Sequence, residues 1–233
     1  MKRSVPLLLL ILVSCASEPE SIRGEERGAF IPMLRLSHSL TGQPPLPPDS
    51  HETRGRSMFE FDVAYGHGES DQTIEAGEDV DFAGTVVFGP AKIDSEYDLT
   101  TVRARVTFGP DFGAFRFEGT TGLGANHFAL RVNSGPFEEH DHTTSLGLLL
   151  GLRGAVVPMT WSEFYVTVEE FLGAGSGDAV QVSMVEVGVT LTPTDLGAGF
   201  VLGWRRWHYL EERNGSDVNL ELSGLMVGVE LKY

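Results

Sequence analysis

The amino-acid sequence predicts an all-β fold: a single eight-stranded antiparallel transmembrane β-barrel over residues 58–233, preceded by an extended N-terminal tether. Three observations lead to this prediction. Eight segments after residue 57 alternate apolar and polar residues with a period of two. Turn residues separate these segments, and the connections alternate between tight and long. Helical periodicity is absent from any window longer than about ten residues.

Residues 1–14 are expected to be an export signal that is removed from the mature protein. Met1-Lys2-Arg3 is cationic, and the apolar run from Val5 to Val13 is shorter than the roughly 20 residues of a membrane-spanning helix. The single cysteine, Cys15, follows directly and cannot form an internal disulfide. An ordinary signal peptide that happens to end in a cysteine is the alternative.

The segment Leu12-Val13-Ser14-Cys15 resembles the lipobox of bacterial lipoprotein precursors. The resemblance implies cleavage before Cys15 and a diacylglycerol on its thiol. Ala16 stands where an aspartate would, by the usual sorting rule, indicate retention in the inner membrane. The resemblance therefore implies a lipid-anchored protein of the outer membrane that meets the lipoprotein-processing machinery.

Residues 15–57 are predicted to form the lipidated cysteine and a Pro-rich periplasmic tether. The run from Gly42 to Ser50 contains four prolines and is compatible with neither a helix nor a central strand. The segment from Phe30 to Leu36 is apolar enough to pack against the rest of the protein, but its position is not predicted.

The eight predicted strands follow in order, at 58–66, 100–108, 115–132, 146–153, 163–169, 185–191, 196–205 and 225–233. Each has one apolar face. These faces contain Phe59, Phe61, Val63 and Tyr65; Val102, Ala104, Val106 and Phe108; Phe115 and Phe117; Leu146, Leu148, Leu150 and Leu152; Phe164, Val166 and Val168; Val185, Val187, Val189 and Leu191; Leu196, Ala198, Phe200, Leu202 and Trp204; and Leu225, Val227, Val229, Leu231 and Tyr233.

The connections between the predicted strands indicate how a barrel would be oriented. Tight turns are expected at 109–113, 156–159 and 192–195, and longer polar loops at 67–99, 133–143, 172–178 and 210–217. In bacterial barrels the short turns are periplasmic. An even number of strands then brings the C-terminus to the same side as the tether. Residues 81–88 could form a further strand or a structured loop, which would change the count.

The polar strand faces favour a membrane barrel over a soluble one. They carry charges of both signs mixed with glycine, and an eight-stranded barrel has just enough interior space for side chains. We therefore expect the charges to lie inside and the apolar faces to contact lipid. The charged residues of these faces are Glu60, Asp62, Arg103, Arg105, Arg116, Glu118, Arg153, Glu163, Glu169 and Arg205.

The last six residues, Gly228 to Tyr233, resemble the terminal assembly signal of outer-membrane proteins. Gly228, Leu231 and Tyr233 match its glycine, apolar and terminal aromatic positions, whereas Met226 departs from the usual polar residue. Together with the lipobox and the alternating segments, residues 58–233 resemble small eight-stranded outer-membrane barrels of the OmpA/OmpX type. The resemblance implies a monomer whose partners are outer-membrane lipids and the barrel-assembly machinery.

The apolar phase changes within three predicted strands, near Met184, Trp204 and Leu222. We expect β-bulges there, or the points at which the strands leave the membrane. Trp204, Trp207 and Tyr209, and with them Trp161, would then lie at the membrane interface. Core aromatics of a β-sandwich are the alternative.

Two groups of residues are candidates for chemical sites. Glu138, His140 and His142 could contribute to a divalent-metal site, with a solvated acidic loop as the alternative. Ser37-His38-Ser39 and Trp207-His208 carry serine or histidine that a lipid-acting hydrolase would need, yet no motif of such an enzyme is present. No catalytic residue and no cofactor are predicted.

The formal charge of -16 disfavours a nucleic-acid partner. The expected function is a non-enzymatic outer-membrane barrel lipoprotein with a structural or surface-binding role in the cell envelope. Two alternatives stay open: a barrel enzyme that hydrolyses or transfers acyl chains of lipopolysaccharide, and a soluble periplasmic β-sandwich or lipocalin-like lipoprotein that binds an apolar ligand.

Overall fold

The computed structural model describes residues 22–77, 79–82, 85–135, 137–175, 178–193, 197–212 and 217–232, and the structural statements below concern these residues. No helix among them is long and apolar enough to cross a membrane. They form eleven strands: β1 Ile22–Ser39, β2 Arg54–Ile74, β3 Asp79–Phe82, β4 Thr85–Phe88, β5 Ala91–Asp111, β6 Phe115–Ser134, β7 Phe137–Met159, β8 Ser162–Gly175, β9 Asp178–Leu191, β10 Ala198–Glu212 and β11 Asp217–Lys232.

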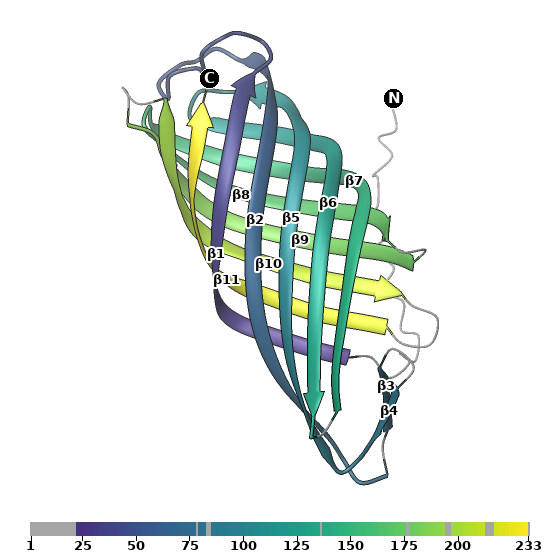
Figure 1. The fold of residues 1–233 in the computed structure, drawn as a ribbon. Coiled ribbons are helices and arrows are strands. Elements are labelled where there is room, and N and C mark those ends of the chain that lie inside the picture. The colour runs from purple at the N-terminus through teal and green to yellow at the C-terminus, as the bar shows by residue number, and fades with distance from the viewer. Residues whose placement is uncertain are drawn as a thin grey trace, which may run out of the picture.

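Nine of the strands join in one sheet that closes on itself, in the order β1-β11-β10-β9-β8-β7-β6-β5-β2 (Figure 1). The pairing is antiparallel around the ring except between β1 and β11, which are parallel. Strands β3 and β4 form a separate two-stranded hairpin in the connection from β2 to β5. The segment 81–88, which the sequence left open as strand or loop, therefore adds nothing to the ring.

The prediction of eight strands is wrong by one, because β1 comes from the segment assigned to the tether. Phe30 and Leu34 point outward and are exposed, whereas Ile31, Met33 and Arg35 are buried inside the ring. This is a period-two alternation, but it is short and lies in a part of the chain without a sustained period, which was therefore predicted to be a tether. The odd count makes β1 and β11 run in the same direction. The start of β1 and the end of β11 therefore lie at opposite ends of the ring, contrary to the predicted topology.

The two ends of the ring differ in their connections. At the short-turn end, residues 112–114, 160–161 and 192–197 link neighbouring strands. At the opposite end, the predicted long loops are mostly strand: β2 continues to Ile74, β5 begins at Ala91, and β6 ends at Ser134 just before β7. These loops were overestimated because the apolar residues of the extended strands switch to the inward face, so their alternation looked interrupted.

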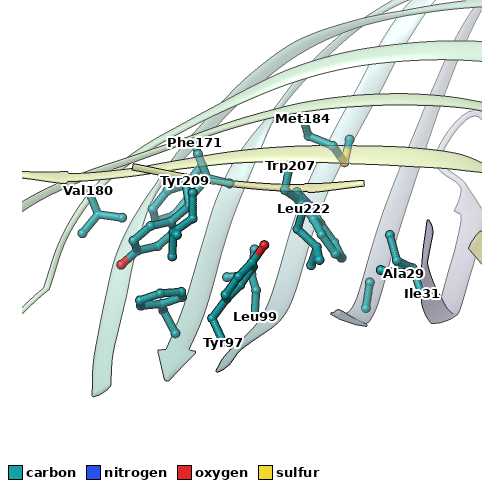
Figure 2. Close-up of a cluster of buried hydrophobic side chains, with 14 of the residues drawn as sticks. Ala29, Ile31, Tyr97, Leu99, Phe171, Val180, Met184, Trp207, Tyr209 and Leu222 are labelled. Atoms are coloured by element: carbon teal, nitrogen blue, oxygen red, sulfur yellow. The ribbon is translucent and has the colours of Figure 1, made fainter. Parts of the chain in front are cut away.

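The predicted β-bulges at the three phase changes are also wrong. The pairings of β8 with β9, β9 with β10 and β10 with β11 are continuous. In the described strands, register shifts occur between Arg27 and Ala29 and between Val156 and Met159. What changes along the barrel is the chemistry of the interior. Near the opposite end, the inward residues form an apolar cluster that includes Ile31, Tyr97, Leu99, Phe171, Val180, Met184, Trp207, Tyr209 and Leu222 (Figure 2).

Strands β1 and β2 pair over only part of their length. Met33–Ser39 pair with Met58–Ala64, beyond which β1 follows β11 alone to Ile22 and β2 follows β5 alone to Ile74. Two residues explain this divergence, which is visible in Figure 1. Pro32 has no N–H to donate to β2, and Gly28, with φ of 102°, lies in the bulge that bends β1.

Candidate functional site: the outer belt and the ionic lumen

The outward faces of the nine strands form a continuous apolar surface near the short-turn end, which we call the outer belt. Leu123, Leu148 and Phe200 have 64%, 60% and 60% of their surface exposed, values unusual for such side chains in a water-soluble protein. Exposed members of the belt are Phe30, Leu34, Phe59, Phe108, Phe117, Leu123, Leu146, Leu148, Leu150, Leu152, Phe164, Val166, Val168, Val185, Val187, Phe200, Leu202, Trp204, Leu225, Val227, Val229 and Leu231.

The outer belt ends well before the strands do. In β7 it runs from Leu146 to Val156, close to the roughly 9–11 residues that a tilted strand needs to cross a bilayer. Towards the opposite end, the outward residues become polar, while the inward residues become apolar. These polar outward residues include His67, Glu69, Asp71, Asp94, Glu96, Asp98, His127, Arg131, His140, His142, Gln181 and Arg206. One barrel therefore carries two opposite arrangements, apolar outside in the belt and apolar inside beyond it.

Behind the outer belt, the interior is filled by buried ion pairs, which we call the ionic lumen. Glu169 accepts hydrogen bonds from Arg103 (2.6 Å) and Arg105 (3.1 Å). Arg105 Nε also donates to Glu60 Oε2 at 2.9 Å, and the other oxygen of Glu60 accepts from Arg153 at 3.1 Å. All five side chains have at most 8% of their surface exposed. The pairs connect β2, β5, β7 and β8 across the lumen.

The same chain of pairs continues to the short-turn end. Glu163 accepts from Arg153 Nη2 at 2.6 Å and also from Arg116. Arg116 Nε lies 3.5 Å from Asp111 Oδ2. These contacts bring the ion pairs up to the mouth of the barrel.

A second group of buried charges centres on Glu186 of β9. Its carboxylate accepts hydrogen bonds from Arg35 (3.0 Å), Arg205 Nε (2.9 Å) and the hydroxyl of Tyr165 (2.5 Å). Arg205 also donates to Asp62 at 3.2 Å. Sequence reasoning missed Arg35, because it lies in the segment assigned to the tether. The alternation of Arg35 with Leu34 and Leu36 was the signal that could have identified it.

Buried charges are tolerated only when they are paired and hydrogen-bonded. In the ionic lumen each carboxylate that joins strands meets at least one guanidinium, so the groups can stay charged away from bulk water. Their side chains meet one another in the interior from β2, β5, β7 and β8. This arrangement agrees with the predicted direction of the strand faces: Leu148, Val187 and Val229 point outward, while Arg103 is buried.

The structure separates the three predicted interface aromatics. Trp204 is 46% exposed on the outer face, and Trp161, which is 45% exposed, lies in the turn between β7 and β8. Trp207 and Tyr209 instead point into the lumen with 0% and 2% exposure, so their assignment to a membrane interface is wrong. Tyr209 stacks on Phe128 with ring centroids 4.4 Å apart and donates to Glu211. Trp207 and Tyr209 lie in the apolar cluster because β10 keeps its alternation beyond the belt.

The predicted metal ligands lie in β7, not in a loop. His140 and His142 share the outward face, as two histidines two residues apart in a strand must. His140 Nε2 lies 3.1 Å from Glu138 Oε1, and Arg131 Nε donates to His140 Nδ1 at 3.2 Å. Within the described parts of the chain, no three His, Cys, Asp or Glu side chains gather in a way that could hold a metal ion.

The serine and histidine residues considered for hydrolysis are distributed over the barrel. Ser37 points inward, where its hydroxyl donates to Glu230 Oε1 at 2.9 Å, and its neighbour His38 is exposed. His208 lies on β10 with Nε2 2.9 Å from Asn219 Oδ1. The segment Ser37-His38-Ser39 thus has its first two side chains on opposite sides of β1.

The proposed lipidation and assembly residues are only partly described. Cys15 and Tyr233 lie outside the described residues. Gly228 faces inward, where a side chain would meet the backbone of Met33 at 2.5 Å, and Leu231 is 39% exposed on the outer face. The inward position of Gly228 therefore has a packing reason of its own.

Comparisons of the chain with protein-family models, curated proteins and solved structures gave no match.

Proposed function

We propose that this protein is a lipid-embedded barrel of the bacterial outer membrane, non-enzymatic and closed to solutes, with a structural or surface-binding role in the cell envelope. The observation that carries the proposal is the pairing of the outer belt with the ionic lumen. In water such a distribution is unfavourable, because it exposes large apolar side chains and buries charges. In a bilayer the same distribution places hydrocarbon against hydrocarbon.

The dimensions of the outer belt support this proposal. Its length along β7 matches the span of a tilted membrane strand. The long polar continuation of β2, β5, β6 and β7 would then project from the membrane, with the short turns on the periplasmic side. The ionic lumen supports a closed barrel rather than a pore. A structural or binding role therefore fits better than transport.

An enzymatic role finds less support. The hydroxyl of Ser37 is engaged with Glu230, and His208 with Asn219, so neither pairs with the other in the contacts described. A soluble barrel with an apolar centre fits the end beyond the belt, but not the belt itself. The lipid-acting enzyme and the soluble lipoprotein are therefore less well supported than the membrane barrel.

The decisive test introduces a positive charge at two outward positions, one in the outer belt and one on the polar surface beyond it. Leu150→Arg, near the middle of the belt in β7, should lower the free energy of unfolding in lipid vesicles by about 2–4 kcal/mol, as a cationic side chain facing the bilayer centre does. Gln181→Arg, an equally outward change beyond the belt, should stay within about 0.5 kcal/mol. Heat-modifiable migration in detergent gels would monitor folding of both variants. Equal effects of the two substitutions would contradict membrane embedding.

The lipid anchor is tested separately through Cys15, the proposed site of diacylglycerol attachment. In Cys15→Ser the proposal expects the protein to lose the mass of the lipid but to remain in the membrane fraction, because the barrel itself is embedded. Recovery of Cys15→Ser in the aqueous phase would instead favour the soluble lipoprotein. If Cys15→Ser stays in the membrane fraction and lacks no lipid mass relative to the unchanged protein, the lipidation proposal is refuted but the barrel proposal is not.

A further inference from the structure

The short-turn mouth of the barrel contains a cavity of about 560 Å³. Its size lies within the roughly 300–1,000 Å³ of small-molecule sites. Strand ends of β1, β2, β6, β8 and β9 form the floor, and residues 42–45 of the connection from β1 to β2 form the opposite wall. The cavity does not involve the outer belt, so the inference drawn from it does not rest on membrane embedding.

The Pro-rich wall of this cavity is held in place by specific contacts. Leu46 is buried, and its backbone N–H donates to Asp111 Oδ2 at 3.2 Å. Asp111 also accepts from the N–H of Gly113 at 2.9 Å. A side chain at Gly113, whose φ is 76°, would approach the carbonyl oxygen of Pro47 to 2.5 Å, so the connection packs closely on this turn. The wall is therefore preformed, which lowers the entropic cost of binding.

The floor of the cavity is polar and includes a hydroxyl that lacks a partner. Thr190 is 2% exposed, and its Oγ1 has no hydrogen-bond partner among the described residues. Leaving such a group unpaired costs about 1–3 kcal/mol, and because Thr190 lines the cavity, a ligand that bonds its hydroxyl would recover this energy. Ser162 and the Arg116–Glu163 pair lie in the same floor and add further donors and acceptors.

The rim of the cavity combines two cations with an aromatic ring. Arg56 is half-buried; its Nε lies 3.8 Å from Glu118 Oε1 and its Nη2 contacts Met58 Sδ, which leaves Nη1 without a polar partner among the described residues. Lys232 donates to Thr192 at 3.0 Å and lies 3.6 Å from Glu230. Trp161 is 45% exposed beside them. An exposed indole presents an apolar face together with a polar edge.

We propose that this mouth cavity binds an acidic saccharide. The hydroxyls of a sugar ring match the mixed donors and acceptors of the floor, including Thr190, and its apolar ring face matches Trp161. An acidic group on the sugar matches Arg56, because a guanidinium forms paired hydrogen bonds with a carboxylate. A simple inorganic anion would leave most of the cavity and the indole without contact.

The test uses the purified barrel in detergent and three probes: trigalacturonate, the neutral trisaccharide maltotriose, and inorganic phosphate. Calorimetry should show saturable binding of trigalacturonate, weaker binding of maltotriose, and no competition by equimolar phosphate. Thr190→Val should weaken trigalacturonate binding about five- to tenfold through the loss of one hydrogen bond. Arg56→Gln should remove the preference for trigalacturonate over maltotriose.

Trp161→Ala should weaken both saccharides, whereas Trp204→Ala, which removes an equally exposed indole from the outer belt, should leave both affinities unchanged. Heat-modifiable migration would verify that each variant is folded. The proposal is overturned if no saccharide binds saturably, if phosphate binds as tightly as trigalacturonate, or if Trp204→Ala is as damaging as Trp161→Ala. Failure here would leave the membrane proposal untouched, because that proposal depends on the outer belt.

Discussion

The indole ring of Trp207 on β10 lies directly against the backbone of Gly66 on β2. A Cβ atom at Gly66 would lie 2.6 Å from Cζ3 of Trp207 and 2.3 Å from Cδ2 of Leu222. This contact crosses the lumen at the level where β1 and β2 separate. It is one of the packing interactions that join the two sides of the barrel there.

Gly66→Ala should therefore destabilise the barrel. The added methyl group must displace two buried side chains, and overpacking of this kind costs about 1–3 kcal/mol. Gly55→Ala is the matched control on the same strand, since a Cβ there meets nothing within 4 Å. Urea unfolding followed by tryptophan fluorescence would compare the two variants, and an equal loss of stability in both would contradict the close packing at Gly66.

Glu60→Ala should be among the more damaging single changes in the ionic lumen. It removes the carboxylate that joins Arg105 and Arg153 and leaves both guanidinium groups short of a buried partner. Breaking a buried ion pair from one side costs about 3–5 kcal/mol. The exposed Glu69→Ala should change the free energy of unfolding by less than about 0.5 kcal/mol. A small effect of Glu60→Ala would mean that the two arginines find other partners.

The separation of β1 from β2 predicts uneven amide protection along β2. Residues Met58–Ala64 are paired on both sides, whereas Gly66–Ile74 pair with β5 alone. We expect about half of the amides in Gly66–Ile74 to exchange at least about tenfold faster than those in Met58–Ala64, because one edge is open. Hydrogen exchange read by mass spectrometry would measure this difference. Uniform protection would indicate that the edge is paired in solution.

His67 should titrate above its ordinary range. Its Nδ1 lies 2.9 Å from Asp98 Oδ1, and the hydrogen bond to this carboxylate raises the pKa of His67. A raised folded-state pKa means that the protonated imidazole stabilises the fold at pH below about 6.5, and that this contribution is lost as the pH rises through the folded-state pKa. NMR titration of His67 should show the pKa falling in Asp98→Asn and unchanged in Glu96→Gln. A pKa that does not respond to Asp98→Asn would exclude the carboxylate as its cause.

Much of the fold could be predicted from the alternation of side chains. Six of the eight predicted strands lie within observed ones, and the other two, 196–205 and 225–233, overlap β10 and β11 over most of their length. The charged faces with Glu60, Arg103 and Arg153 point inward as expected. A period of two dictates that such residues share one face. The ninth strand was missed because its alternation, from Phe30 to Leu36, is short and lies in a part of the chain predicted to be a tether. Its Pro32 is acceptable because one strand edge is free there. The predicted bulges were wrong. Along these strands the apolar residues move from the outward face to the inward face, and in the sequence this change looks like a shift of register.

By itself, the sequence determined which residues share a face, and hence that charges and apolar side chains would lie on opposite sides of each strand in the belt. Only the tertiary structure decided how the ring closes, where Trp207 lies, and which strand ends form the mouth cavity with Thr190. The physical reason is that alternation is a local property of each strand. Closure, lumen filling and cavities depend on contacts between residues far apart in the chain, such as Gly66 with Trp207 and Arg35 with Glu186.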